Sequence, residues 1–348
     1  MKAPRKLLAP LLAACALSLA PSPALALEAK EGLVKILVNE SNARVSLYKL
    51  VDIARGRYES FLFGQEATTS FATLGIDGKQ VKLGDAFDYR FSARRSDTGV
   101  VLEFRSSFCV VRESVDFAKS EGAALADGVR IGFEIENVSE RDEVVGLRYL
   151  LDTFLAEKSG IHFATDKAEK LPVETELLPG GGEAWIATPG EKLGFMIQLA
   201  GKGVDRPDRV LLANWKRLSE APWGFEANGQ RNFTLVPYSI NDSAAALFWE
   251  PTPLPRGGTR KIGFALGSFS EKGYSAPEAA SVTEQLFGAT VLEGRPADPR
   301  TALAADLVAV RDLLTRIDRA IETGDAKPEE ITAWKSILER LEARKKGY

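Results

Sequence analysis

The pattern of apolar and polar positions changes character along the chain. From Gly32 to Leu155, apolar residues alternate with polar ones in short runs that turn residues separate. Phe87, Tyr89 and Phe91, for example, alternate with charged neighbours. Alternation of this kind is typical of strands with one buried and one solvated face. The turn pair Asp77-Gly78 between two apolar runs predicts a type I′ hairpin.

Strand-like runs resume at Val173 and continue to Phe269. Turn residues recur about every 8 to 12 positions, which is typical of a sandwich or barrel. We therefore predict a mainly β fold over residues 27–277, a large antiparallel β-sandwich. One supersandwich and two adjacent sandwiches both fit the pattern, with a subdivision near 157–172 in the second case. The stretch from Asn214 to Pro255 holds three tryptophans and is expected to break into short extended pieces that close the core.

The C-terminal 51 residues follow a different period. After a linker at 278–297, Asp298-Pro299 forms a helix start, Gly324 a helix end and Pro328 a second start. Apolar residues recur at steps of three and four in both runs, which predicts an α-helical hairpin over 298–348 with a coiled-coil-like seam. The seam residues are Leu303, Leu307, Val310, Leu314, Ile317, Ile321, Ile331, Trp334, Leu338 and Leu341.

The N-terminus has the three parts of a secretory signal peptide. A basic segment precedes an apolar run, and Ala24-Leu25-Ala26 fits the small-x-small cleavage rule. Residues 1–26 are therefore expected to be removed, leaving a periplasmic or extracellular protein. A lipobox-like reading around Cys15, which would give a lipoprotein, is the alternative. No other stretch reaches the ~20 apolar residues of a membrane span.

Composition narrows the partners. The net charge is -3, and loss of the signal peptide removes three basic residues and leaves -6. No long basic cluster is present, so we expect no nucleic-acid partner. Cys109 would be the only cysteine left after cleavage, which excludes an intramolecular disulfide. We expect it to be a small buried hydrophobe.

A single histidine excludes several chemistries. The chain has no Gly-x-Ser-x-Gly elbow that would supply a serine nucleophile for His162, and it has too few His and Cys residues for an ordinary zinc site. We predict no catalytic set, no metal and no cofactor from these motifs. Carboxylate pairs are the remaining enzymatic option: Glu174 and Glu176 share one strand face, and Asp152 ends another strand.

Tryptophans supply a binding hypothesis. Trp223, in a Pro-Trp-Gly turn, and Trp215 could present flat faces to sugar rings, and the turn at Asn241 and Asp242 is a further surface candidate. Core packing is the alternative, and it is favoured for Trp249 by its apolar neighbours.

Scattered motifs in the middle of the chain resemble those of uncharacterised exported bacterial proteins with a large β-sandwich. They are Leu151-Asp152-Thr153, Glu176, Trp185, Ala213-Asn214-Trp215, Asn241-Asp242-Ser243-Ala244 and Trp249-Glu250-Pro251. That resemblance implies a fold and no activity. In size and exported location the chain also resembles the large β-sandwiches that epimerise sugars. That family relies on paired histidines, which this chain lacks.

The missing catalytic sets favour a non-enzymatic exported sandwich, a binding or structural module. Its C-terminal hairpin is expected to dock on a protein partner or another copy. Two alternatives stay open: a carbohydrate-binding sandwich that takes envelope glycan, and a carboxylate-based glycan-active enzyme.

Overall fold

The computed structural model describes residues 26–64, 68–123, 125–153, 161–188, 193–221, 223–235, 240–274, 299–324 and 328–345. Almost all of the expected signal peptide and of the linker lies outside these residues, so export stays a prediction. The described part confirms a mainly β fold with antiparallel sheets and two C-terminal helices.

The N-terminal strands form a four-stranded sheet in sequence order. Its members are β1 (Ala26–Glu31), β2 (Val34–Asn39), β3 (Arg44–Asp52) and β4 (Arg57–Ser60). Val34, Ile36 and Val38 of β2 are fully buried while the residues between them are half-buried, as the alternating pattern predicts.

The largest sheet has eight strands in the order β12-β14-β15-β20-β10-β9-β8-β7. Their bounds are β7 (Arg90–Arg95), β8 (Gly99–Arg105), β9 (Cys109–Ala118), β10 (Gly128–Asn137), β12 (Ala164–Thr165), β14 (Trp185–Thr188), β15 (Phe195–Gln198) and β20 (Thr259–Ser268). A 3-10 turn, η1 (Pro179–Gly181), precedes β14.

The third sheet has six strands in the order β13-β16-β19-β11-β5-β6. These are β5 (Phe71–Ile76), β6 (Lys79–Lys82), β11 (Glu143–Asp152), β13 (Thr175–Leu177), β16 (Arg209–Asn214) and β19 (Ser243–Leu254). Asp77 and Gly78 adopt positive φ angles of 47° and 77° between β5 and β6, as a type I′ turn requires. A separate pair joins β17 (Thr234–Leu235) to β18 (Ile240–Asn241).

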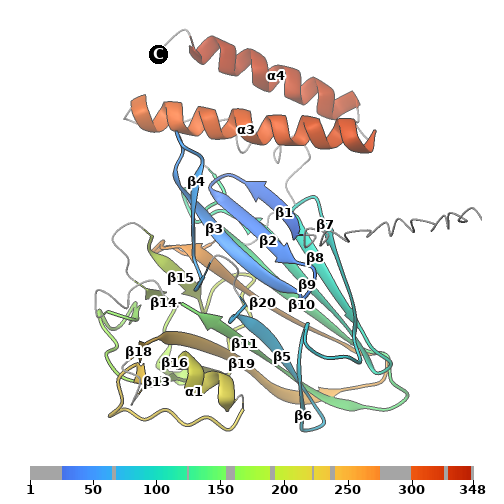
Figure 1. Cartoon of the computed structure of the whole chain (residues 1–348), viewed down its shortest axis with the longest axis vertical. Coiled ribbons are helices and arrows are strands. Elements are labelled where there is room, and N and C mark those ends of the chain that lie inside the picture. The colour runs from blue at the N-terminus through green and yellow to red at the C-terminus, as the bar shows by residue number, and fades with distance from the viewer. Residues whose placement is uncertain are drawn as a thin grey trace, which may run out of the picture.

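One apolar core connects the three sheets. Phe133 of the eight-stranded sheet contacts Tyr149 of the six-stranded sheet at a ring-centroid distance of 5.9 Å, and Val34 and Leu47 of the four-stranded sheet join the same cluster. Strands that follow residue 172 enter the same two large sheets as strands that precede it. Figure 1 shows how the three sheets are arranged around this core.

A covering segment lies on the outer face of the six-stranded sheet. Asn214 ends β16 and caps α1 (Trp215–Glu220), its side chain accepting a hydrogen bond from the Lys216 backbone N–H. We call residues 215–221 and 223–233 the strap. The sequence led us to expect extended pieces here. That expectation was wrong for Trp215–Glu220, because a capping asparagine at the end of β16 starts a short helix. Figure 1 shows α1 in front of β16 and β19.

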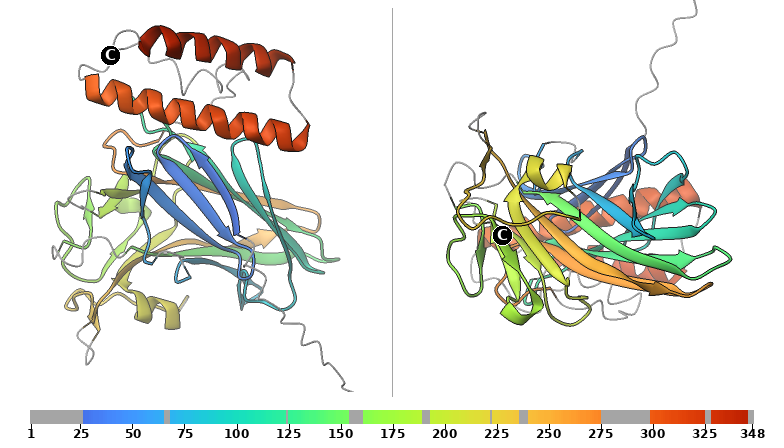
Figure 2. Two further views of the ribbon diagram at one scale, coloured as in Figure 1. Left: turned by 45° about the horizontal axis from the view of Figure 1, so that its top comes forward. Right: turned by 90° about the horizontal axis from the view of Figure 1, so that it is seen from below.

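Two antiparallel helices confirm the predicted C-terminal hairpin. They are α3 (Pro299–Thr323) and α4 (Pro328–Lys345), with Gly324 at a φ of 69° after α3. Figure 1 and the left view of Figure 2 show the two helices beyond the four-stranded sheet. Arg311 ties α3 to that sheet by donating to the Tyr58 hydroxyl (2.9 Å) and the Gly32 carbonyl (2.7 Å).

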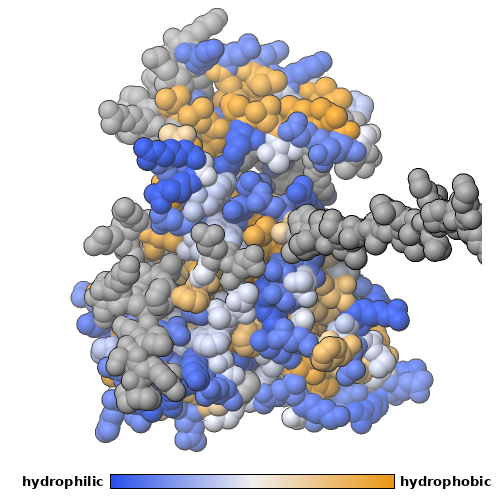
Figure 3. Space-filling model, viewed as in Figure 1, coloured by the Kyte–Doolittle hydropathy of each residue, from blue (hydrophilic) through white to orange (hydrophobic). Residues whose placement is uncertain are grey.

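The hairpin seam differs from the predicted one. Ile317, Trp334 and Leu341 pack against buried Leu313 and Ile337 between the helices. Val310 is half-buried, whereas the other predicted seam residues are exposed: Leu303, Leu307, Leu314, Ile321, Ile331 and Leu338. Because α3 also turns Arg311 towards the sheet, it is rotated relative to a pure two-helix seam. The exposed side chains form the apolar surface over α3 and α4 in Figure 3, and their association with a partner stays a prediction.

None of the described helices is both long enough and apolar enough to cross a membrane.

Candidate functional site

Two arginines flank one phenylalanine on the outer face of the six-stranded sheet. The strand register places Arg209 of β16 opposite Phe248 of β19, and Phe248 opposite Arg148 of β11. Their guanidinium carbons lie 4.3 Å (Arg209) and 5.4 Å (Arg148) from the centroid of the Phe248 ring. These distances are typical of cation–π contacts, so one ring supports two positive charges.

Arg148 is fully buried and incompletely paired. Its exposed fraction is 0%, and Nη2 donates to the Leu218 carbonyl of α1 at 2.9 Å. Among the residues that the structure describes, Nε and Nη1 have no hydrogen-bond partner. Burial, and then the charge of nearby Arg209, lower the pKa of Arg148 to about 10, so it stays charged at neutral pH. A buried cation with two unpaired donor atoms is costly and marks a candidate site.

Arg209 connects the strap to two acids. Nη2 donates to the Trp223 carbonyl at 3.1 Å and lies 3.4 Å from Glu250, while Nη1 lies 3.8 Å from Glu176. Nε of Arg209 has no partner. The two carboxylates are partly open to solvent, with side-chain exposures of 39% for Glu176 and 42% for Glu250. The site therefore has an open acidic end and a closed cationic end at Arg148.

Trp223 covers the open end. Its Nε1–H donates to Glu250 Oε2 at 3.2 Å, and its ring contacts Phe248 edge-on at 5.8 Å. The far edge of the indole lies against Gly75, where an added Cβ would come within 3.3 Å of the ring. Absence of a side chain at Gly75 makes room for this edge of the indole, and the indole is half-buried.

A buried acid fixes the rest of the strap. Glu174 has a side-chain exposure of 0% and accepts hydrogen bonds from the Arg217 guanidinium and from the Asn228 backbone N–H (3.1 Å). Its own backbone N–H donates to the Arg231 carbonyl at 2.7 Å. This carboxylate thus has a structural role in positioning the strap.

The three acids singled out from the sequence lie on this one face. Glu176 pairs with Leu211, and Asp152 lies opposite Ala244, both on the side that the strap covers. Glu174 and Asp152 are buried, with exposed fractions of 2% and 1%, so Glu176 alone among them meets solvent. The second solvent-exposed acid beside the Arg209 guanidinium is Glu250.

The predicted aromatic platform is divided between two places. Trp215 is half-buried and donates to the Thr69 carbonyl at 2.9 Å, and its backbone N–H bonds the Asp242 carbonyl at 3.2 Å. Asn241 lies next to them in β18. Trp223 lies beside Glu250, roughly 25 Å further along the strand from Asp242. The structure thus groups Trp215, Asn241 and Asp242, but Trp223 belongs to the arginine site.

Other sequence candidates have structural roles. His162 is buried and stacks on Phe233 at 4.5 Å, and buried Cys109 lies 3.2 Å from the Tyr89 hydroxyl. Trp249 is in the core, as expected. Among the described residues, no group of three or more His, Cys, Asp or Glu side chains is arranged to hold a metal ion.

Sequence reasoning missed Arg148, Arg209 and Glu250. A signal existed for Arg148, since it interrupts the apolar run Leu147 to Leu151. Strands that are apolar on both sides are covered on both faces, and a charge inside such a run is buried. Arg209 is the first residue of β16, where a charged residue is common, and Glu250 follows the apolar run of β19, just before Pro251.

Comparisons with known proteins find similarity in fold. No protein-family model and no curated protein matches the chain. A galactose mutarotase-like protein from Lactobacillus casei matches 70% of this chain and 100% of its own, with 10% identity and a TM-score of 0.42. A galactose mutarotase related enzyme from Lactobacillus acidophilus matches 72% of this chain and 100% of its own, with 9% identity and a TM-score of 0.43. A proposed aldose 1-epimerase from Escherichia coli matches 70% of this chain and 98% of its own, with 8% identity and a TM-score of 0.45.

These matches correct one expectation. The expectation of a non-enzymatic binding or structural module is corrected, since the solved structures that match are described as mutarotase-like proteins or as an aldose 1-epimerase. Docking of the C-terminal hairpin on a partner is a separate expectation and stays a prediction. The carbohydrate alternatives agree better with these solved structures. The likeness is one of fold at low identity, and we take no residue's role from it.

Proposed function

We propose that this sandwich binds carbohydrate on the outer face of its six-stranded sheet. The binding groups are Trp223, Arg209, Glu176 and Glu250, which we call the acid–tryptophan cluster. The observation that carries the proposal is the contact of both acids with one guanidinium beside a half-buried indole.

This combination suits a sugar chemically. Sugar hydroxyls donate and accept hydrogen bonds, so they pair with carboxylates and with a guanidinium at once. An indole offers a large apolar face for the C–H side of a sugar ring and a polar N–H at its edge. Partial exposure of Glu176 and Glu250 leaves the cluster open to a ligand from solvent.

The acid pair supports a second candidate, a carboxylate-based reaction on the bound sugar. Since Glu176 and Glu250 each lie within 4 Å of the same guanidinium, their carboxylate oxygens are no more than about 10 Å apart, which is the upper limit for the paired acids of glycoside hydrolases. In ring opening, one carboxyl would donate a proton to the ring oxygen while the other, as a carboxylate, takes the proton of the anomeric hydroxyl; in cleavage, the proton goes to the glycosidic oxygen and the carboxylate deprotonates an attacking water. Either ring opening or glycosidic cleavage fits such a pair.

Binding is tested by calorimetric titration of the full chain with neutral and acidic mono- and oligosaccharides. We expect Trp223→Ala to weaken binding of any sugar ligand at least ~10-fold, because it removes the stacking face and the Glu250 hydrogen bond. Trp185→Ala is the matched control, since Trp185 is also half-buried but lies on β14 of the other large sheet, against Phe269. Sugar binding that is absent in the wild type, or equally weakened by both substitutions, would refute the proposal.

The acid pair is tested by Glu176→Gln and Glu250→Gln. If the pair performs acid–base chemistry, each substitution should lower the rate about 100-fold or more while binding changes far less. Polarimetry follows interconversion of anomers, and a reducing-sugar assay follows cleavage. A wild-type protein that binds a sugar without either activity would leave a binding protein and dismiss the enzymatic candidate.

A further inference from the structure

We propose that Arg148 and Arg209 form an oxyanion site beneath the strap, so that the ligand is a sugar bearing a carboxylate or phosphate group. This rests on the proposed function for the sugar itself. The anion site, however, follows from the unpaired donors of the two arginines and can be tested separately.

Among the described residues, three buried donor nitrogens on this face have no hydrogen-bond partner. They are Nε and Nη1 of Arg148 and Nε of Arg209, and both guanidiniums contact the Phe248 ring. Buried donor groups in native proteins are nearly always paired, so unpaired ones indicate a missing partner. The missing partner must be an acceptor, since every unpaired atom is a donor.

The charge around Arg148 requires an anion. Among the described residues, the charge that shifts its pKa is that of another cation, Arg209, and no carboxylate forms an ion pair with it. The chain pairs another buried guanidinium fully: Arg44, 4% exposed, donates to the Leu83 carbonyl at 2.6 Å and forms an ion pair with Asp85 at 2.6 Å. The fold can therefore supply an acid to a buried arginine, and it does not supply one to Arg148. A neutral sugar hydroxyl would satisfy a donor but leave the charge uncompensated.

The dimensions fit one acidic sugar. Arg209 and Arg148 stand on strands that are next-nearest neighbours, so their Cα atoms are about 10 Å apart. An acidic sugar bound at the acid–tryptophan cluster would place its ring beside Arg209 and direct its charged substituent towards Arg148. Charge-assisted hydrogen bonds to a guanidinium are roughly twice as strong as neutral ones, which gives selectivity for the acid.

Entry to Arg148 requires the strap to move. The strap is held over the arginines by carbonyl groups, at Leu218 on Arg148 and at Trp223 and Phe225 on Arg209. An anion is a stronger acceptor for guanidinium than a carbonyl, so it can replace these contacts. Since Trp223 belongs to the strap, its fluorescence should report the movement.

The test compares matched ligands on the full chain. Galacturonate, glucuronate and glucose 6-phosphate are titrated beside galactose and glucose by calorimetry and tryptophan fluorescence. We expect the wild type to bind at least one acidic sugar about tenfold or more tightly than its neutral counterpart. Arg148→Met should abolish that preference, so that acidic and neutral sugars bind with equal affinity. Arg112→Met, on the eight-stranded sheet, is the matched control and should keep the preference. Uronates and the sugar phosphate distinguish a carboxylate from a phosphate substituent.

Inorganic phosphate and acetate separate this inference from the proposed function. If no sugar binds but phosphate or acetate raises the Tm of the wild type and not of Arg148→Met, the anion site stands and the carbohydrate proposal fails. If sugars bind with no preference for acids, or with a preference that survives Arg148→Met, the anion site is refuted and carbohydrate binding stands. If Arg148→Met does not fold, Arg148→Gln, which removes the charge but keeps a polar side chain, takes its place, and an undiminished preference there refutes the site.

Discussion

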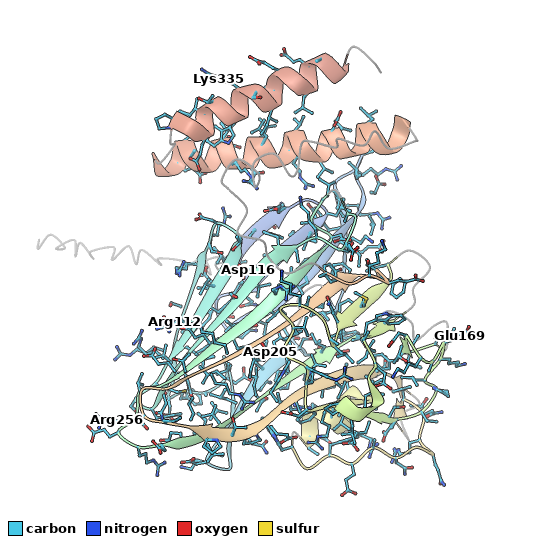
Figure 4. The ribbon with its side chains drawn as sticks, turned by 180° about the vertical axis from the view of Figure 1, so that it is seen from behind. Arg112, Asp116, Glu169, Asp205, Arg256 and Lys335 are labelled. Carbon is cyan, nitrogen blue, oxygen red and sulfur yellow. The ribbon has the colours of Figure 1, made fainter. Side chains whose placement is uncertain are left out.

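Arg112 and Arg148 both stand in the middle of a large sheet, one on each outer face of the sandwich. Arg112 is 35% exposed and contacts Glu103 (3.2 Å), Glu134 (3.0 Å) and Glu136 (3.2 Å) on neighbouring strands. Figure 4 shows it on the open face of the eight-stranded sheet, near Asp116. Arg148 has no exposure, no acid and a strap above it.

The difference shows where this protein keeps an uncompensated charge. On the eight-stranded sheet, opposite charges alternate between strands and water screens them, so each pair contributes little. On the six-stranded sheet a polypeptide cover excludes water and leaves a guanidinium without its counterion. Such a cost is tolerated where a ligand supplies the missing charge. Five substitutions, measured in three experiments, test this contrast.

The largest effect is expected on the strap anchor. Glu174→Ala should lower the free energy of unfolding by about 3 to 4 kcal/mol, because it leaves the Arg217 charge and the Asn228 N–H without their partner in a buried place. Glu134→Ala on the opposite face, whose side chain is 37% exposed, should cost under ~1 kcal/mol. Urea denaturation followed by circular dichroism measures both. Equal losses would mean that the strap is as loosely held as the open face.

Strand β9 carries Arg112 on its solvent-facing side and the buried carboxyl of Glu113 on the side that faces the core. Burial raises the pKa of Glu113 to about 7 from an ordinary 4.5, and hydrogen bonding from Tyr149 and the Arg44 charge only partly oppose this. The folded protein thus holds this proton to higher pH than the unfolded chain does, and stability is lost as pH rises from about 4.5 to about 7.

Glu113→Gln should remove that loss. The shift corresponds to about 3 kcal/mol, so the variant should gain up to that amount over the wild type at pH 8 and little at pH 4. Unfolding free energies at a series of pH values measure the difference. A difference that does not depend on pH would show that the carboxyl titrates normally in the folded state.

The smallest effect, but with a change of sign, is expected from the two arginines themselves. Arg148→Met should stabilise the free protein by about 1 to 2 kcal/mol, since it replaces an unpaired buried charge by an apolar chain of similar length. Arg112→Met should destabilise it by under ~1 kcal/mol, and 0.5 M salt should reduce that loss. Thermal denaturation at two salt concentrations gives both values. A loss of stability in Arg148→Met would assign this residue to holding α1 through the Leu218 carbonyl.

Local chemistry alone determined much of the architecture. Asp77-Gly78 set a hairpin because only residues tolerant of positive φ fit a type I′ turn. Pro299, Gly324 and Pro328 fixed the helical hairpin for similar backbone reasons. Alternation in β2 predicted its buried side correctly, since one face meets the core and the other does not.

Tertiary structure decided everything that depends on what covers a face. The exposed seam residues Leu307 and Leu314 have the spacing of buried ones, and α3 is rotated by its contact with the four-stranded sheet at Arg311. Arg148 becomes buried only because a strap more than 60 residues later in the chain folds over β11. Its meeting with Arg209 and Glu250 depends on strand order in the sheet. Strand order arises from long-range packing, which the spacing of residues along one chain does not encode.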